Sequence, residues 1–224
     1  MDFKGSHFPK DVILMSIRWY VSYPLSYRHV EELLRERGIK IDHATINRWV
    51  VKYSPSLESK FRQVKKPIGK SWRMDETYIK VKGEWVYYYR AVDKEGQTID
   101  FLLSPTRDTQ AARSFFEKAI ERSGKPEKVN MDKSGANLAG LEQINKSFPE
   151  GQKIGVRQVK YLNNLIEQDH RGIKKIVKPM LGFKSFLCAA ATLCGIELSH
   201  MIRKGQSVMQ KTLSPWQQFY ALAG

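Results

Sequence analysis

The sequence predicts an α/β protein in which an all-α helix-turn-helix domain precedes a mixed β-sheet covered by helices. Three observations support this class. Apolar residues recur at helical spacing over the first quarter of the chain. From Ser71 the pattern changes to runs of aromatic and β-branched residues, which are typical of strands. After three such runs, strands alternate with helices, as expected when later strands join an antiparallel sheet in parallel.

The chain of 224 residues is 42% hydrophobic, which is enough for a packed core, and its formal net charge is +15. A charge of this size favours a polyanionic partner, most often nucleic acid. Residues 1–70 carry a net charge of +7, residues 71–150 carry none, and residues 151–224 carry +8. This distribution predicts two nucleic-acid-binding surfaces around a neutral core whose acidic residues serve another purpose.

Cysteine content and hydropathy point to a reducing compartment and away from a membrane. Cys188 and Cys194 lie in an Ala-rich apolar stretch without a CxxC pattern, so they are expected in the core rather than at zinc or in a disulfide. The longest apolar stretch, near Phe186–Ile196, is too short for a membrane span and long enough for a buried helix. With no signal-peptide pattern at the N-terminus, we expect a cytoplasmic protein without a membrane partner.

The N-terminal region predicts three helices, at 11–20, 26–38 and 42–53. Ser26 and Asp42 are suited to cap the second and third, and Gly38 lies where a C′ glycine would end the second. Two helices joined by a short turn, with polar and basic residues near the start of the second, form the helix-turn-helix pattern. An ordinary three-helix bundle is the alternative. The residues expected to face DNA are His43, Thr45, Asn47, Arg48 and Lys52.

The rest of the chain predicts a linker, a sheet domain and a tail. The expected strands span 71–83, 84–93, 97–104, 127–131 and 153–159. The expected helices span 108–124, with Asp108 as cap, a segment to about 147, then 161–175 and 183–203. The predicted domains are 1–54 (helix-turn-helix), 55–70 (basic linker), 71–205 (catalytic) and 206–224 (C-terminal tail).

Three acidic residues could meet at one edge of this sheet. Asp75 lies in the first strand, Asp132 directly follows the fourth, and Glu167 lies on the helix after the fifth. Glu76 is expected on the opposite side, because side chains alternate along a strand. Clustered carboxylates need a cation, and oxygen-only ligands favour Mg²⁺ or Mn²⁺. Two such ions would suit phosphoryl transfer.

Each of these acids also has a simpler interpretation. Asp132 could cap the following helix, and Asp75 could be a charge on an edge strand. Glu167 could form a helical ion pair with Arg171, four residues on. His170 is expected on the surface or beside the site rather than as a metal ligand.

The stretches "WRMDETYIKVKGEWVYYYRAVD", "MDK" and "KYLNNLIEQDHR" closely resemble the DDE transposases of short bacterial insertion sequences. The best match is the insertion-sequence-six family of the retroviral-integrase superfamily, and it extends over most of the chain. The resemblance implies a ribonuclease-H-like core with Asp75, Asp132 and Glu167 as the catalytic, metal-binding triad. The last two are 35 residues apart, the separation typical of this group. It also implies that Lys174 contacts the terminal DNA.

The function implied is that of an enzyme, a DDE-type polynucleotidyl transferase. It would bind the terminal inverted repeats of its element and catalyse Mg²⁺-dependent 3′-end cleavage and strand transfer into target DNA with two ions, for which Mn²⁺ could substitute. A homodimer or higher oligomer in the double-stranded DNA complex is expected, associated with the nucleoid. Further residues expected to contact DNA are Lys160, Asn163, Arg171, Lys174 and Lys175. Asn163 could equally have a structural role.

Three alternatives remain open from the sequence: a non-enzymatic DNA-binding regulator, a nuclease that never joins strands, and an inactive transposase copy. The last follows from two departures from the family pattern. "KSGAN" follows Asp132 where relatives usually have Lys-Ala-Pro, and Val156 precedes Arg157 where relatives often have His-Arg.

Overall fold

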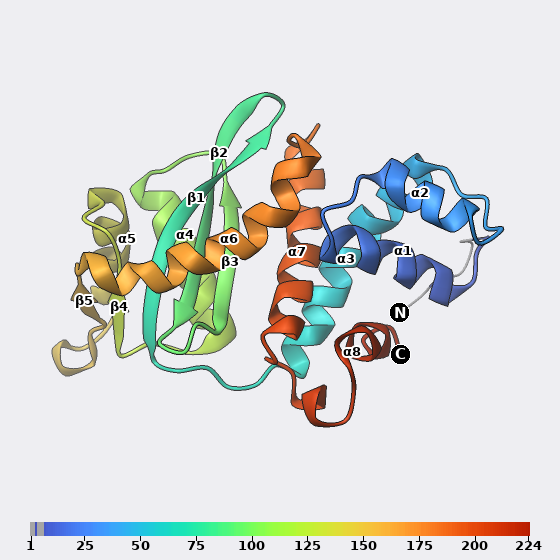
Figure 1. The fold of residues 1–224 in the computed structure, drawn as a ribbon. Coiled ribbons are helices and arrows are strands. Elements are labelled where there is room, and N and C mark those ends of the chain that lie inside the picture. Colours follow the sequence, from blue (N-terminus) through green and yellow to red (C-terminus); the bar gives the residue numbers. More distant parts are fainter. Residues whose placement is uncertain (1–2, 4–6) are drawn as a thin grey trace. The chain divides into compact units, whose positions relative to one another are not determined.

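The computed structural model describes residue 3 and residues 7–224, and the chain divides into two compact units (Figure 1). The helical unit comprises Met1–Lys66 with Gly172–Gly224, and the sheet unit comprises Pro67–Arg171. Each is described by itself.

The helical unit confirms the three helices predicted at the N-terminus. Its helices are α1 (Lys10–Ser22), α2 (Tyr27–Arg35), α3 (His43–Gln63), α7 (Phe186–Arg203) and α8 (Pro215–Ala221), with the 3-10 turns η3 (Lys178–Met180) and η4 (Val208–Lys211). Both predicted caps form. The amide of His29 donates to Ser26 Oγ at 3.1 Å, and that of Thr45 donates to Asp42 Oδ1 at 2.9 Å. These bonds satisfy N–H groups that the first helical turn leaves without partners.

Helix α3 is longer than predicted. It was expected to end at Tyr53, but it continues through Pro55 to Gln63. A proline inside a helix removes one hydrogen bond and costs about 3 kcal/mol relative to alanine. The added turns bury Leu57 and Phe61 completely. Packing of this extension therefore outweighs the local cost of Pro55. The apolar periodicity up to Tyr53 could not predict that the helix continues.

Helix α7 packs against α1 and α3. By length and composition it is apolar enough to cross a membrane, but 61% of it is buried inside the protein, as in a core helix. A Cβ on Gly195 would lie 2.7 Å from atoms of both Ser54 and Val21, so glycine permits the close approach of the three helices.

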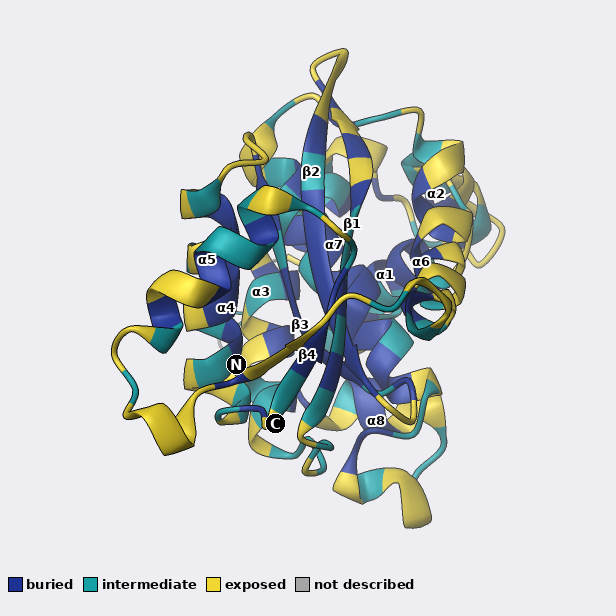
Figure 2. Cartoon of the chain, turned by 90° about the vertical axis from the view of Figure 1, so that its left-hand side faces the viewer, coloured by how far each residue is buried: buried dark blue, intermediate teal, exposed yellow. Residues whose placement is uncertain are grey.

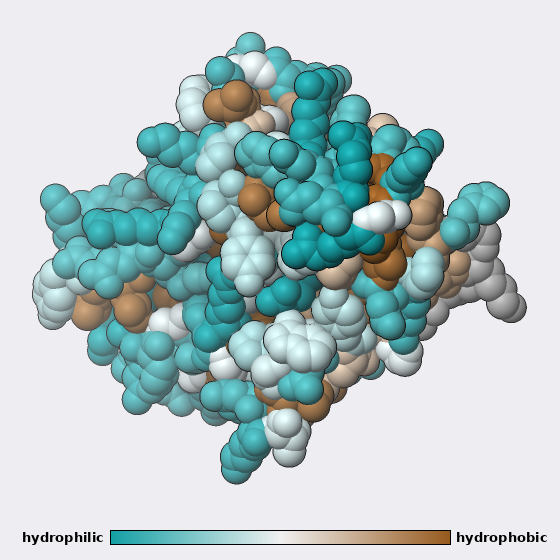
Figure 3. Space-filling model, turned by 45° about the vertical axis from the view of Figure 1, so that its right-hand side comes forward, coloured by the Kyte–Doolittle hydropathy of each residue, from teal (hydrophilic) through white to brown (hydrophobic). Residues whose placement is uncertain are grey.

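On the face drawn in Figure 3, hydrophilic side chains cover most of the surface and apolar ones form small separate areas.

The sheet unit has the ribonuclease-H-like arrangement that the family resemblance implied. Its strands are β1 (Ser71–Val81), β2 (Glu84–Asp93), β3 (Thr98–Ser104), β4 (Lys128–Asn130) and β5 (Gly155–Arg157). They lie in the order β3-β2-β1-β4-β5. The first three are antiparallel, and β4 and β5 join in parallel. The mixed sheet predicted from the sequence is therefore confirmed.

Helices cover both faces of this sheet. The helical segments of the unit are α4 (Thr109–Ser123), α5 (Gly135–Asn145), the first turns of α6 (Asn164–Val177), and the 3-10 turns η1 (Glu150–Gln152) and η2 (Lys160–Asn163). Figures 1 and 2 show α4 and α5 on one face and the start of α6 on the other. Trp72, Met74 and Tyr89 on the strands pack with Phe115 and Phe116 of α4 in the core.

The two central strands differ in length, and this difference creates space beside β1. Strand β4 pairs with β1 only from Ser71 to Arg73. Beyond Arg73 this edge of β1 pairs with no strand among the described residues, although β1 continues for eight more residues to Val81. The chain leaving β4 at Asn130 therefore reaches the open edge next to Asp75.

Candidate metal-binding active site

Three carboxylates gather at the open edge of β1. Asp75, Glu76 and Asp132 each offer an oxygen, and these oxygens all lie within 4.8 Å of one another. Asp75 and Glu76 come from β1, and Asp132 is the second residue after β4. Among the residues that the structure describes, no other group of three His, Cys, Asp or Glu side chains could hold a metal in this way.

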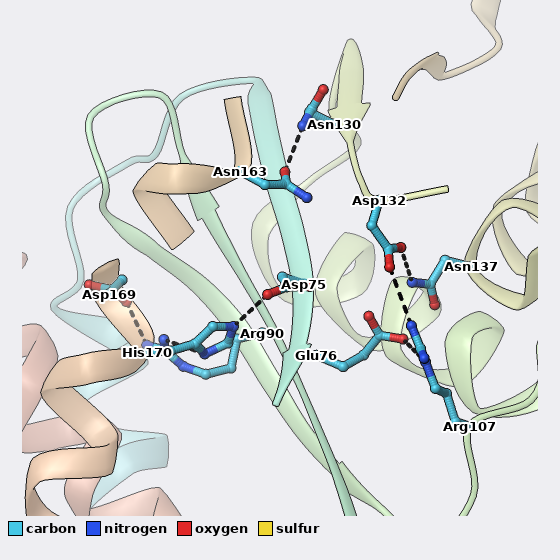
Figure 4. A network of polar contacts seen from close by, with 10 residues as sticks. All are labelled: Asp75, Glu76, Arg90, Arg107, Asn130, Asp132, Asn137, Asn163, Asp169 and His170. Carbon is cyan, nitrogen blue, oxygen red and sulfur yellow. Dashed lines mark hydrogen bonds and ion pairs between the residues drawn. The ribbon is translucent and has the colours of Figure 1, made fainter. Parts of the chain in front are cut away.

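The expectation that Glu76 points away from this group is wrong. Alternation along β1 does send the side chains of Asp75 and Glu76 toward opposite faces. Because no strand covers this edge beyond Arg73, both side chains can bend around it toward Asp132. Figure 4 shows Glu76 directed toward Asp132 and Arg107.

Arg107 links two of the carboxylates. Its Nε donates to Glu76 Oε1 at 2.9 Å, and its Nη2 donates to Asp132 Oδ2 at 3.3 Å. Arg107 immediately precedes Asp108, which caps α4 as predicted by accepting from the amide of Ala111. The hydrogen bond to Glu76 raises the pKa of Arg107. The sequence interpretation missed Arg107, although a basic residue beside a helix cap at this end of β3 was a possible signal.

Glu76 is the least well compensated of the three acids. Burial raises the pKa of Glu76, the hydrogen bonds from Arg107 and Asn137 oppose that rise, and the charge of Asp132 adds to it. Within the described residues its Oε2 is buried and has no hydrogen-bond partner. Burying an unpartnered carboxylate oxygen is costly. A hard cation at this edge would fit both the all-oxygen set and this oxygen.

Asp132 is held by the turn that leads into α5. Its Oδ1 accepts from the amide of Ser134 at 3.1 Å and from Asn137 Nδ2 at 3.4 Å. The N-cap position of α5 belongs to Ser134. Asp132 therefore precedes the helix rather than capping it, and its second oxygen faces Arg107.

A chain of buried polar groups holds Asp75 from the other face of the sheet. Arg90, the cross-strand partner of Asp75, is fully buried and donates to Asp169 Oδ2 at 2.7 Å. Its Nη1 lies 3.4 Å from His170 Nδ1, and His170 Nε2 lies 3.3 Å from Asp75 Oδ2 (Figure 4). Arginine can only donate, so Nδ1 is the acceptor in its contact with Arg90, whereas the approach of Nε2 to Asp75 is within ion-pair distance but is not a hydrogen bond.

His170 is thus a buried neighbour of Asp75 rather than a surface residue: it is 4% exposed. It contacts a member of the carboxylate group through Nε2 and arginine through Nδ1. The sequence left open whether His170 lies on the surface or beside the site, and the structure places it beside the site.

Glu167 lies outside the group of three in this structure. It is exposed on α6, and among the described residues it forms no ion pair with Arg171. Its neighbours at helical spacing are both anchored. Asn163 bonds to Asn130 at the end of β4, and His170 reaches Asp75 on β1. Glu167 therefore lies in the sequence between two residues that contact the strands, while its own side chain is exposed.

The side chains predicted to read DNA in α3 are mostly exposed and locally paired. His43 lies 2.9 Å from Glu31, and this hydrogen bond lowers the pKa of Glu31. Arg48 donates to Thr45 Oγ1 at 2.6 Å. Lys52 lies over a tyrosine ring, and Asn47, half-buried, bonds to Tyr27. Asn47 is thus the least available of the five.

The predicted DNA contacts around α6 separate into two kinds. Four are exposed: Lys160, Arg171, Lys174 and Lys175. Asn163 is 4% exposed, and its Oδ1 accepts from Asn130 Nδ2 at 2.6 Å. This placement supports the structural alternative for Asn163, because it ties the start of α6 to the end of β4.

Comparison with known proteins gives concordant matches. A model of the DDE domain family matches residues 69–206. The transposase for insertion sequence-like element IS431mec of Staphylococcus aureus is 42% identical over 202 residues, which cover 90% of this chain and 88% of that protein. The transposase for insertion sequence element IS257 in transposon Tn4003, also from Staphylococcus aureus, is 41% identical over the same shares.

Solved structures with a similar fold come from retroviruses. The HTLV-2 integrase catalytic core domain in complex with magnesium (trimeric form) superimposes with a TM-score of 0.46 and 20% identity, covering 58% of this chain and 84% of that one. The catalytic core domain of BIV integrase gives a TM-score of 0.43 and 14% identity over the same shares.

Proposed function

The chain belongs to the DDE-domain transposases of bacterial insertion sequences, and we propose that it cuts the DNA ends of its own element and joins them to target DNA. Members of this family are enzymes of the polynucleotidyl transferase class. The observation that carries the proposal is the meeting of Asp75 and Asp132, from separate strands, at one open sheet edge.

Asp75, Asp132 and Glu167 are proposed as the residues that hold two Mg²⁺ ions, with Mn²⁺ as a substitute. The bound ions would activate an attacking oxygen and stabilise the leaving one. The buried, unpartnered Oε2 of Glu76 supports a cation at this edge. Glu76 itself is proposed to act on the site through Arg107, with which it pairs.

The anchors of α6 support Glu167 as the third ligand. Asn163, just before α6, bonds to Asn130, two residues before Asp132, and His170 on α6 lies 3.3 Å from Asp75. Glu167 lies between these two residues in the sequence, three residues before His170. Its carboxylate is exposed and therefore available to a ligand.

The surrounding residues have positioning roles in this proposal. His170 lies beside Asp75, with Nε2 at 3.3 Å from Oδ2, and Ser134 with Asn137 holds Asp132 through Oδ1. Fixed carboxylates leave less reorganisation for the moment of reaction. Water attacks phosphorus at the element end, the bond to the 3′ oxygen breaks, and the element keeps a free 3′-hydroxyl. That hydroxyl then attacks a target phosphate, whose bond to the neighbouring target 3′ oxygen breaks, and the target 3′-hydroxyl leaves.

DNA recognition is proposed for the helix-turn-helix of α2 and α3. Exposed Arg48 is placed near base edges, and other basic residues contact phosphates. Two element ends must be brought together, so a homodimer or larger assembly on DNA is proposed. The substrate lies in the bacterial cytoplasm, where the protein would associate with the nucleoid.

The test is Mg²⁺-dependent nicking of a duplex that carries the terminal inverted repeat, with wild type, Asp132→Asn and Glu117→Gln compared. Glu117 lies exposed on α4, away from the carboxylates, and serves as the control. We expect Asp132→Asn to lose nicking and Glu117→Gln to keep it. Undiminished nicking by Asp132→Asn would contradict the proposal. Repeat binding without any metal-dependent nicking by wild type would favour a regulator.

A further inference from the structure

The hairpin of β1 and β2 extends beyond the rest of the sheet and carries exposed aromatic side chains. Pairing with β3 ends at Tyr87, and pairing with β4 ends at Arg73, so within the described part of the chain the tip has no strand on either side (Figure 2). Lys82 and Gly83 close it with φ of 52° and 88°, the left-handed pair of a two-residue hairpin turn.

One face of this hairpin bears a row of side chains that we call the aromatic strip: Tyr78, Lys80, Trp85 and Tyr87. Tyr78 pairs across the strands with Tyr87, and Lys80 pairs with Trp85, so all four project from the same face. Tyr78 is 50% exposed and Trp85 is 63% exposed. The rings of Tyr78 and Tyr87 lie 5.4 Å apart.

The opposite face of the hairpin is buried. Thr77, Ile79 and Val81 are at most 5% exposed, and Val86 and Tyr88 at most 8%. The exposed aromatics are therefore not a consequence of a fully solvated hairpin, because only one of its two faces is open. Large aromatic side chains left at the surface in this way commonly mark a binding site.

The aromatic strip is continuous with the carboxylate site. The next cross-strand pair on the same face is Glu76 with Tyr89, and Glu76 belongs to the carboxylate group. Tyr78 interacts electrostatically with Arg107, which contacts Glu76 and Asp132. A strand of DNA with its scissile phosphate at the carboxylates could therefore extend directly onto the strip.

The chemistry of the strip fits nucleotides whose bases are not paired. Tyrosine and tryptophan rings stack on bases, and neighbouring lysines bind the phosphates between them. Lys80 belongs to the strip and Lys82 to the turn, and both are exposed. Glu84, the acid at the tip, pairs with Val81 and so belongs to the opposite face. Inside a duplex both faces of each base are already stacked, and only the two terminal pairs offer a free face.

We propose that the aromatic strip binds unpaired nucleotides of the DNA strand next to the cut, with Trp85 and Tyr78 as stacking platforms. This inference rests on the proposed function, since it places DNA at the carboxylates. It adds a site for melted or single-stranded DNA to a protein whose helix-turn-helix would bind duplex. The site would hold the DNA end open while the scissile phosphate is in place.

Binding is measured in EDTA, so that no cleavage occurs, with a fluorescein-labelled single strand of about 12 nucleotides and with the same strand in a blunt duplex. The variants are Trp85→Ala, Trp85→Phe and Trp216→Ala. Trp216 is the matched control, because it is 50% exposed on α8 in the helical unit. Thermal unfolding verifies that each variant is folded.

We expect Trp85→Ala to weaken single-strand binding about tenfold, the loss expected when a base loses its aromatic platform, and to leave duplex affinity nearly unchanged. Trp85→Phe should restore most of the affinity, and Trp216→Ala should change neither. Should Trp85→Ala fail to fold, the wild type and Trp85→Phe are compared by quenching of tryptophan fluorescence on addition of the strand. Quenching that is equal in the two proteins contradicts the proposal.

Equal single-strand affinities for Trp85→Ala and Trp216→Ala would overturn the inference. So would a Trp85→Ala protein that loses a dimer in sedimentation and keeps its DNA affinity, because the strip would then bind a second copy of the chain. These outcomes are independent of catalysis: a protein can nick DNA normally and fail this test, or pass it without nicking.

Discussion

Among single residues, Arg107 determines the charge of the carboxylate site when no metal is bound. It is the cation that contacts both Glu76 and Asp132, and its side chain is 35% exposed. A metal ion at the same oxygens would compete with it. Arg107 is thus expected to stabilise the empty site and to lower the affinity for divalent ions.

Replacing Arg107 tests this competition. In EDTA, Arg107→Gln should unfold at a lower temperature than wild type, and its free energy of unfolding should fall by about 1 kcal/mol. The reason is that hydrogen bonds to charged groups are lost and the acids repel. Added Mg²⁺ should raise its unfolding midpoint more than it raises that of wild type. Arg113→Gln, which removes an exposed pair with Glu117 on α4, is the control. A Mg²⁺ shift equal to or smaller than that of wild type would contradict the competition.

The buried pair of Arg90 with Asp169 gives a second prediction. Asp169→Asn removes the carboxylate charge that lies 2.7 Å from the fully buried Arg90, so we expect a loss of about 3 kcal/mol in the free energy of unfolding. Glu117→Gln, which breaks an exposed pair, should cost at most about 0.5 kcal/mol. Urea denaturation measures both. Similar small losses would show that Arg90 is solvated or otherwise compensated.

Single-residue roles were only partly predictable from the sequence. Asp75 and Asp132 could be placed near one edge on the condition that the first and fourth strands are neighbours, because periodicity indicates the strand ends but not the order of strands in the sheet. Arg107 and the bent side chain of Glu76 could not, because their ion pair joins residues 31 positions apart and depends on where β4 stops. Periodicity predicts neither an ion pair between distant residues nor the residue at which β4 stops.

Among the elements, α4 and α5 lie unusually close, and a glycine makes this possible. A Cβ on Gly140 would lie 2.9 Å from both the Ala112 Cβ and the Arg113 amide nitrogen of α4. Such distances require one helix to move. Since Asn137 and the turn at Asp132 belong to the same segment, this contact also fixes the carboxylate site.

Gly140→Ala should therefore destabilise the protein by about 1 to 3 kcal/mol, as overpacked cores do. Gly135→Ala at the first position of α5 is the matched control, since nothing lies within 4 Å of its Cβ position. It should be neutral or stabilising by up to about 1 kcal/mol, because alanine favours helix. Thermal unfolding of the two variants measures the difference. Equal changes in stability for Gly140→Ala and Gly135→Ala would mean that α5 can shift to accommodate the added methyl group.

Comparison of the predicted and observed element boundaries shows which parts of the fold local sequence patterns can predict. The β1–β2 hairpin matches its prediction closely, because alternation is a local signal, although Lys82 and Gly83, expected at the end of the first strand, form the turn. Strands β4 and β5 are shorter than the predicted 127–131 and 153–159, with three residues each. Their length is limited by their parallel partners, which lie far away in the sequence.

For the whole molecule, the net charge of +15 predicts how DNA binding responds to salt. Neutralising phosphates releases counterions, so affinity falls with salt in proportion to the number of contacts. Between about 50 mM and about 200 mM salt we expect duplex affinity to drop by roughly a hundredfold or more. Fluorescence anisotropy over this range measures the slope, and an affinity independent of salt would contradict phosphate contacts.

Variants of α6 test which residues contribute to the salt dependence of DNA affinity. Lys174→Gln and Lys175→Gln, both at exposed positions, should each reduce the slope by about 1 and weaken binding alike on all sequences. Arg48→Ala should instead weaken binding to the terminal repeat more than to random DNA. Equal losses on both DNAs would count against base readout by Arg48.

The central claim is that Asp75, Asp132 and Glu167 together hold the metal for DNA cleavage. The structure gathers Glu76 rather than Glu167 with the two aspartates, so the most direct measurement compares Mg²⁺-dependent nicking by Glu167→Gln and Glu76→Gln. We predict that Glu167→Gln abolishes nicking, while Glu76→Gln retains part of it because Glu76 acts through Arg107. Wild-type nicking by Glu167→Gln, with none by Glu76→Gln, would contradict the account and place the third ligand on β1.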